Sequence, residues 1–203
     1  MTWEPQTERV LLLGTGNRYI HAAPTKDAWK ACWNFVLEEL SNLPTGSMIV
    51  EGGCRGSPDF AFSEAAKRLG HHCITYHLDG RKTYGEKLGS WLRTGDYPAT
   101  PFMRNLAMAA RARLALQDGW QVRILGCLHS ETKTHGAQMT LECCEHLDLG
   151  DAITRWTWMA KTRAAVIQTG RYHHDASAVL PSPVEDASDG PVDLGAGALE
   201  SVA

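Results

Sequence analysis

The sequence predicts an α/β fold, in which a parallel β-sheet carries helices on both of its faces. Short apolar runs alternate with longer segments whose apolar residues recur at helical spacing. The apolar runs contain few polar residues, as strands do when both faces of their sheet are covered. Turns rich in glycine follow several of these runs, at the end of the strands where such sheets bind ligands.

The first part of the chain predicts a strand, a helix and a second strand. The run at 9–18 is apolar and ends in Gly-Thr-Gly-Asn-Arg, so we expect a buried strand that opens into a loop. Residues 24–44 place apolar side chains at helical spacing and end at Pro44, which predicts a helix. The apolar run at 47–51 predicts the second strand.

The second helix follows the turn Gly-Gly-Cys-Arg-Gly at 52–56. Ser57 is a suitable N-cap, Pro58 suits the first helical position, and Gly70 suits a left-handed residue at the helix end. Residues 72–78 are again apolar and predict a third strand.

The second half of the chain begins with an irregular region. Residues 79–100 have no steady period and are rich in Gly, Lys and Arg, so we expect a long loop. We then expect a helix at 100–119, a fourth strand at 121–128 and a helix at 134–150. Residues 152–159 alternate between apolar and polar, which predicts a fifth strand at an edge of the sheet.

Charge and composition divide the chain into two regions. Six of the 23 acidic residues lie at or beyond position 175, where no Lys or Arg occurs, so residues 1–174 hold 20 basic and 17 acidic side chains. We expect one domain over 1–174 and an acidic, disordered tail over 175–203. The mildly positive domain suits a small anionic ligand, but its charge is too weak for binding long nucleic acid.

Nothing in the sequence indicates secretion or a membrane span. The first ten residues are polar, and no run approaches the ~18 apolar residues that a membrane helix needs. The six cysteines have no disulfide-framework spacing, so we expect a cytoplasmic protein with reduced thiols. The cysteines and histidines between 127 and 146 are irregularly spaced, so we expect no metal site, and no cofactor is predicted.

The turn at 52–56 combines glycines with an arginine at the start of a helix. Backbone N–H groups at a helix N-terminus favour a phosphate, and glycines let a ligand approach the backbone closely. The alternative is structural: Gly52, Gly53 and Gly56 only make a tight strand-to-helix turn, and Arg55 is a solvated surface residue.

Four motifs follow one another in a fixed order along residues 9–150. They are the loop Gly14–Arg18, the turn Gly52, Gly53, Gly56 and Asp59, the helix start Arg104, Asn105 and Met108, and the turn Gly136-Ala137. This pattern resembles that of the SLOG superfamily, which groups the DNA-processing Smf/DprA proteins with the lonely-guy nucleotide hydrolases. Its YspA-like branch is the most similar.

The resemblance implies a Rossmann-like fold and a nucleotide or nucleotide-sugar ligand. Some relatives are phosphoribohydrolases, which cleave the base from a nucleoside monophosphate, and these pair through helices as homodimers. Others bind NAD-derived or cyclic nucleotides without cleaving them. The chain is therefore expected to be an N-glycoside hydrolase or a non-catalytic binder that sequesters a nucleotide signal. DNA-end handling, as in the Smf branch, is a third option, and the acidic tail and modest charge argue against it.

The resemblance also assigns roles to individual residues. In the hydrolases the chemistry is carried by the arginine of the Arg-Asn helix start and by a glutamate in the helix after the last turn, which here are Arg104 and Glu142. The expected ligand-binding residues are Gly14, Gly16, Asn17, Arg18, Gly52, Gly53, Arg55, Gly56, Asp59, Asn105 and Gly136.

Physical reasoning adds Glu51 to the candidate catalytic residues. Breaking an N-glycosidic bond builds positive charge on the sugar, which a carboxylate stabilises, and the departing base needs a proton. Glu51 lies where a strand meets the glycines, and a charge there should be paired or belong to a site. Structural pairing with Arg18 or Arg55 is the alternative. Glu142 and Glu145 share one helix face, where both can simply be solvated.

Overall fold

The structure is a computed structural model that describes residues 8–17, 26–54, 56–76, 101–131 and 135–171. All of them belong to one compact unit of the chain. The helices and strands, with one short 3₁₀ helix (η2), are β1 (Val10–Gly16), α1 (Lys26–Ser41), β2 (Met48–Glu51), α2 (Asp59–Leu69), β3 (His72–Thr75), α3 (Pro101–Gln117), β4 (Gln121–His129), α4 (Gly136–His146), η2 (Gly150–Ala152), β5 (Ile153–Met159) and β6 (Ala164–Thr169). The predicted segments 18–25, 79–100 and 175–203 lie outside the described residues.

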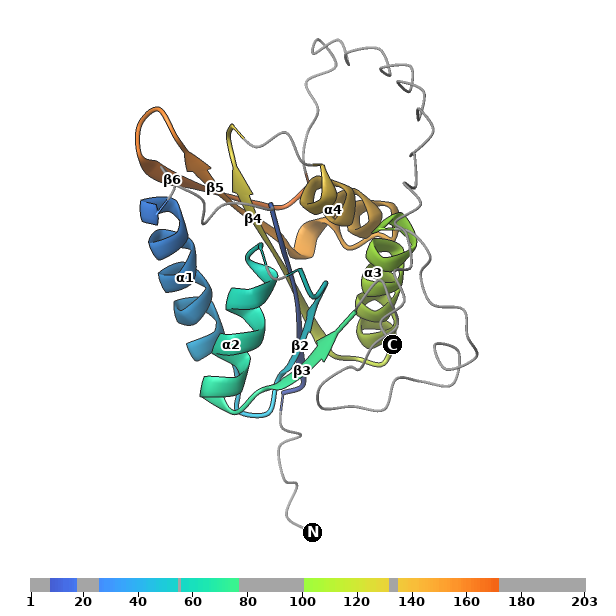
Figure 1. Cartoon of the computed structure of the whole chain (residues 1–203). Helices are drawn as coiled ribbons and strands as arrows, with labels where there is room; N and C mark the ends of the chain where they lie inside the picture. Colours follow the sequence, from blue (N-terminus) through green and yellow to red (C-terminus); the bar gives the residue numbers. More distant parts are fainter. Residues whose placement is uncertain (1–7, 18–25, 55, 77–100, 132–134, 172–203) are drawn as a thin grey trace, which may run out of the picture. The chain divides into compact units, whose positions relative to one another are not determined.

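One sheet holds the described strands in the order β3-β2-β1-β4-β5-β6 (Figure 1). The first five strands are parallel, with Leu12 opposite Ile49 on one side and Arg123 on the other. Helices α1 and α2 cover one face, and α3 and α4 cover the other (Figure 1). The predicted fold class, a Rossmann-like parallel sheet with helices on both faces, is confirmed.

Alternation along the strands sends successive side chains to two separate cores. In β1, Leu12 joins the core beneath α1 and α2, whereas Leu11 and Leu13 join the core beneath α3 and α4. Both cores are closed by the apolar stripes of their helices, such as Phe35 of α1 and Met108 of α3. A strand that feeds two cores must be apolar throughout, which is why β1 is recognisable as a buried strand in the sequence.

Two helix ends illustrate the local chemistry. Gly70 ends α2 with φ of 74° and donates its N–H to the Ala66 carbonyl, as predicted for a left-handed residue. The Ser57 hydroxyl accepts the N–H of Asp59 at 3.2 Å, and Pro58 already has helical dihedral angles. The predicted helix at 134–150 is shorter in the structure, because Asp148 adopts a φ of 59° after His146 and ends the helical run.

The placement of β5 at a sheet edge was wrong, because β6 pairs with it in an antiparallel hairpin. Residues 164–169 are all exposed, although the first four of them are apolar. Strand β5 is covered instead, with Trp156 stacked on Phe35 of α1 at 5.8 Å between ring centroids. Pairing with β6 therefore gives β5 neighbours on both sides.

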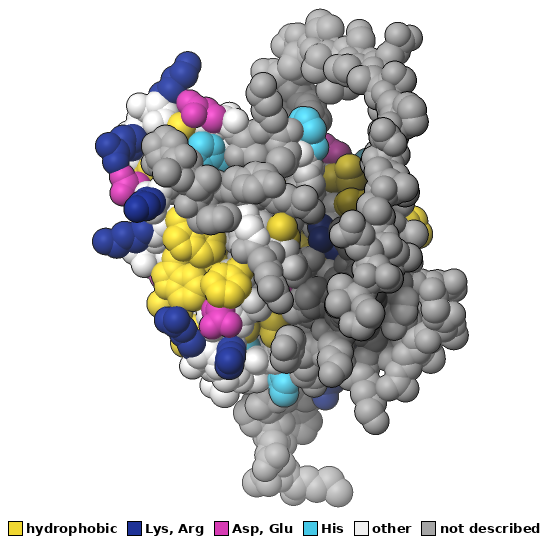
Figure 2. All heavy atoms as spheres, viewed as in Figure 1, with side chains coloured by type: hydrophobic (Ala, Val, Ile, Leu, Met, Phe, Trp, Pro, Cys, Tyr) yellow, Lys and Arg dark blue, Asp and Glu magenta, His cyan; other side chains and the backbone are white. Residues whose placement is uncertain are grey.

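An aromatic patch marks the outer surface of α1 and α2. Figure 2 shows apolar side chains gathered there beside Lys and Arg. Trp29 and Trp33 lie 6.4 Å apart, Arg68 lies over the Trp33 ring at 4.9 Å, and Phe60 is exposed. Within the described part of the chain, no helix has the length and apolar character needed to span a membrane.

Candidate functional site

Three of the four predicted motifs converge at the edge of the sheet where the parallel strands end. Arg104, in the first turn of α3, donates an N–H to the Gly52 carbonyl at 2.8 Å. Its neighbour Asn105 donates to the Gly136 carbonyl at the start of α4, at 3.1 Å. Residues that are far apart in the sequence thus form one polar group at the carboxyl end of β2.

Gly52 is the point around which this group is assembled. A Cβ at this position would lie 2.9 Å from Asp59 Oδ2 and 3.1 Å from Arg104 Cζ. Any side chain would therefore push the carboxylate of α2 and the guanidinium of α3 away from the strand end. Close approach, rather than turn geometry, explains glycine here.

Gly14 and Gly16 serve the packing of α2 on β1. A Cβ on Gly16 would lie 2.2 Å from Pro58 Cγ, and one on Gly14 would lie 2.5 Å from Phe62 Cγ. Both contacts are with the rigid start of α2, so the helix could not stay in place with a larger residue. Packing against α2 therefore explains the glycine at both positions, and their ligand contacts stay predictions.

Glu51 is a buried acid at the end of β2 with a strongly raised pKa. It is 1% exposed, and its carboxyl group accepts the Gly53 N–H at 2.6 Å and hydrogen-bonds to the Thr75 hydroxyl. Burial, reinforced by the negative charge of Asp59, raises the pKa of Glu51 to about 8, although its two hydrogen bonds and Arg104 act in the opposite direction. The carboxyl group therefore holds its proton at neutral pH.

Asp59 completes an acid pair with Glu51. It is buried at the first position of α2, and its Oδ2 accepts the Cys54 N–H at 3.2 Å. Its charge contributes to the raised pKa of Glu51. Two carboxyl groups that share one site are a common arrangement for acid–base chemistry on a single bond.

Arg104 is held in a fixed orientation next to the acid pair. Its Nε and Nη2 both donate to Asn105 Oδ1, at 3.2 and 3.1 Å, and Nη1 donates to Gly52. These bonds use three of the five N–H groups of the guanidinium. The other two have no partner within the described part of the chain, so they are available to a ligand.

The predicted phosphate turn at 52–56 has a different local arrangement. The N–H groups of Gly53 and Cys54 point at Glu51 and Asp59, the chain's own carboxyl groups. An incoming phosphate would have to displace these bonds and approach two acids. Arg18 and Arg55, for which contacts with a ligand or with Glu51 are predicted, lie outside the described residues. Gly56 is half-buried in the turn before α2.

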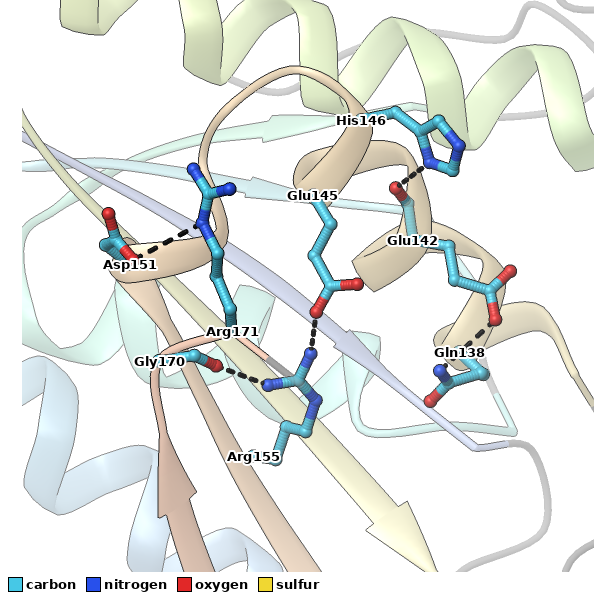
Figure 3. A network of polar contacts seen from close by, with 8 residues as sticks. All are labelled: Gln138, Glu142, Glu145, His146, Asp151, Arg155, Gly170 and Arg171. Atoms are coloured by element: carbon cyan, nitrogen blue, oxygen red, sulfur yellow. Dashed lines mark hydrogen bonds and ion pairs between the residues drawn. The ribbon is translucent and has the colours of Figure 1, made fainter. Parts of the chain in front are cut away.

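Glu142 lies apart from this group. Figure 3 shows it on the outer side of α4, where it accepts a hydrogen bond from Gln138 at 3.2 Å, and its side chain is exposed. Glu145, three residues later, instead forms an ion pair with the buried Arg155 of β5 (Figure 3). Although Glu142 and Glu145 share one helix face, their side chains lie in different environments. The position of Glu142, away from the group at Gly52, does not support its predicted catalytic role.

Sequence reasoning missed two residues at this edge. Thr75 lies directly opposite Glu51 in the register of β3 and β2, and this pairing brings its hydroxyl to the Glu51 carboxyl group. His129 ends β4, and its backbone N–H donates to Asn17 Oδ1 at 2.8 Å. A polar residue at the carboxyl end of an otherwise apolar strand was the available signal for both.

The described cysteines and histidines do not form a metal site. Within the described ranges, no three His, Cys, Asp or Glu side chains lie close enough together to hold a metal ion. All six cysteines are free thiols, and burial raises the pKa of Cys73 and Cys144 to about 12. Such thiols are poor nucleophiles.

Comparison of the chain with protein-family models, with curated proteins and with solved structures found no match.

Proposed function

We propose that the chain is a SLOG-type nucleotide-binding protein that hydrolyses the N-glycosidic bond of a nucleotide. The observation that carries the proposal is the acid pair at the end of β2, in which a buried, protonated Glu51 lies beside Asp59. Bond cleavage of this kind needs one carboxyl group to give a proton and one to stabilise positive charge or orient water. The resemblance to phosphoribohydrolases supports the same reaction.

The reaction assigns one task to each group. As the bond between C1′ and the base nitrogen breaks, its electron pair stays on the nitrogen, which takes the proton of Glu51. Asp59 faces the positive charge that develops on the sugar, and accepts a proton from the water whose oxygen bonds to C1′. The products are the free base and ribose phosphate, and the proton on Asp59 returns to Glu51 through solvent.

Arg104 and Asn105 position the ligand in this proposal. The two free N–H groups of Arg104 donate to a ligand oxygen, and a charge-assisted bond of this kind is strong and directional. Asn105, fully buried between Arg104 and Gly136, fixes the guanidinium in place. This arrangement is preorganised, so little conformational entropy is lost when the ligand binds.

One observation favours the second function, a binder that sequesters an NAD-derived or cyclic nucleotide without cleaving it. Both carboxyl oxygens of Glu51 already have partners, and the side chain is 1% exposed. If no base nitrogen reaches Glu51, the acid pair is scaffold that holds the turn at Gly52–Cys54, and the ligand contacts only Arg104 and its neighbours.

Incubation with a panel of nucleotides separates the two functions. The purified protein is mixed with nucleoside monophosphates, NAD, ADP-ribose and cyclic nucleotides, and both the solution and the heat-released ligand are analysed by mass spectrometry. Free base together with ribose phosphate establishes hydrolysis. An intact nucleotide that is released only on denaturation establishes the binder. If none of the compounds is cleaved or retained, the proposal of a nucleotide ligand is wrong.

A further inference from the structure

The carboxyl ends of β1 and β4 form the topological switch point of the sheet. The chain leaves β1 towards β2 on one side and leaves β4 towards β5 on the other. The helices that make these connections, α1 and α4, lie on opposite faces (Figure 1). The two connections diverge from this point, and open α/β sheets bind their ligands in the space between them.

His129 lies at this switch point with an ordered ring. Its backbone N–H donates to Asn17 Oδ1 at 2.8 Å, and the N–H of Asn17 donates to the Cys127 carbonyl at 3.0 Å, so the two strand ends are joined. The ring Nδ1 accepts the N–H of Glu131 at 3.2 Å. This bond assigns the ring proton to Nε2, on the opposite side of the imidazole.

The Nε2–H group of His129 is a buried donor without a partner. The residue is 8% exposed, and no acceptor for Nε2 exists among the residues that the structure describes. A buried donor left unsatisfied destabilises a fold, so natural proteins rarely keep one without a function. By strand alternation the ring shares its face with Leu125 and Cys127, the face on which α2 meets the end of β1 at Pro58.

The acid pair extends towards this point of the sheet. Asp59 begins α2 directly after Pro58, which packs against the end of β1 at Gly16, and its charge adds to burial in raising the pKa of Cys127 in β4. Glu51 lies at the end of β2, two strand spacings or about 10 Å from β4. A ligand that lies across these strand ends therefore spans the distance from His129 to the acid pair.

We infer that the Nε2–H of His129 donates a hydrogen bond to a phosphate oxygen of the bound nucleotide. The inference rests on the proposed function for the identity of the ligand, and it fixes the direction in which the ligand lies. The sugar faces Glu51 and Asp59, and the phosphate lies across the end of β1, at His129. This places the glycosidic bond at the acid pair and the anionic end at His129.

A matched pair of substitutions tests the donor. His129→Asn keeps an acceptor for the Glu131 N–H but removes the Nε2 donor, whereas His129→Gln places an amide N–H close to the Nε2 position. Calorimetry with adenosine 5′-monophosphate and adenosine measures both variants and the wild type. We expect H129N to lose about tenfold in affinity for the monophosphate and none for adenosine, and H129Q to stay within about threefold of the wild type.

Nitrogen-15 NMR of the His129 ring in the wild type keeps the test independent of variant folding. Adenosine 5′-monophosphate should shift the Nε2–H resonance and adenosine should not. If the monophosphate binds without moving the resonance, and binds H129N as tightly as the wild type, the inference is overturned while the proposed function stands. If inorganic phosphate shifts the resonance but no nucleotide is bound or cleaved, the donor is correct and the proposed function fails. If neither probe moves the resonance, the inference is overturned.

Discussion

At the scale of single residues, Glu51 shows how burial outweighs hydrogen bonding. Its carboxyl group interacts with the Gly53 N–H and the Thr75 hydroxyl and lies near Arg104, all of which favour the charged form. Removal from water and the charge of Asp59 still raise the pKa of Glu51 to about 8. The sequence places an acid beside the glycines, but only the three-dimensional burial raises its pKa.

The raised pKa of Glu51 predicts a pH dependence of stability. Between the ordinary pKa of 4.5 and about 8, the folded state binds a proton that the unfolded state has lost. Stability should therefore fall as the pH rises across this interval, and this contribution is fully present only below pH 4.5. Glu51→Gln keeps a neutral side chain and should lack this slope.

Urea unfolding of the wild type and Glu51→Gln at several pH values between 5 and 8 measures the difference. The variant should gain stability relative to the wild type as the pH rises, and Glu142→Gln, which changes an exposed carboxylate, should follow the wild type. Parallel curves for the wild type and Glu51→Gln would show that Glu51 titrates normally.

Arg104 provides a second prediction at this scale. Arg104→Ala removes two free donors beside the acid pair and should weaken nucleotide binding by about 1.5–3 kcal/mol. Arg113→Ala, which lies further along α3, is the control and should leave the affinity unchanged. Calorimetry that finds equal affinities for both variants removes Arg104 from the site.

At the scale of elements, α4 shows where sequence patterns stop being sufficient. Its period and its glycine start predict a helix, and the structure has one. The pattern does not distinguish Glu142 from Glu145, because both fall on one face and only tertiary packing brings Arg155 of β5 under Glu145. Likewise, β6 contains a short apolar run at 164–167 that was not predicted as a strand, and every residue of β6 is exposed.

The ion pair between Glu145 and Arg155 should stabilise the fold. Arg155 is 3% exposed and also donates to the Gly170 carbonyl, so it ties α4, β5 and the end of β6 together (Figure 3). Glu145→Ala should lower the free energy of unfolding by about 3 kcal/mol, because it leaves a buried guanidinium without its carboxylate. Glu142→Ala should change it by less than about 0.5 kcal/mol. If urea unfolding shows that the two variants lose similar amounts of unfolding free energy, this account of α4 is contradicted.

At the scale of the whole molecule, the alternation of apolar runs and helical segments was enough to predict the sheet and its layers. The resemblance placed the turn at 52–56 and the Arg104-Asn105 helix start in one predicted ligand site, and the structure brings Arg104 into contact with Gly52. The protonation of Glu51 and the unsatisfied donor of His129 could not be predicted, because both depend on burial by segments that are distant in sequence.

The resemblance to hydrolases that pair through helices predicts a homodimer. Phe102, Leu114 and Leu116 of α3 are exposed apolar side chains that such pairing would cover. Leu114→Glu should shift the protein towards monomer at micromolar concentration, whereas Ile167→Glu on the exposed β6 should not. Sedimentation velocity checks this, and a wild-type monomer at micromolar concentration would rule out the dimer.

The central claim is that Glu51 and Asp59 form the catalytic acid pair of a nucleotide N-glycoside hydrolase, and base release by matched variants tests it most directly. The wild type, Glu51→Gln and Glu142→Gln are each incubated with the panel of nucleotides, and free base is quantified over time between pH 6 and 9. We predict that the wild type releases base at a rate that falls as the pH rises through about 8, that Glu51→Gln is at least about a hundredfold slower, and that Glu142→Gln matches the wild type. Base release that is unchanged in Glu51→Gln, or lost in Glu142→Gln, would contradict the claim.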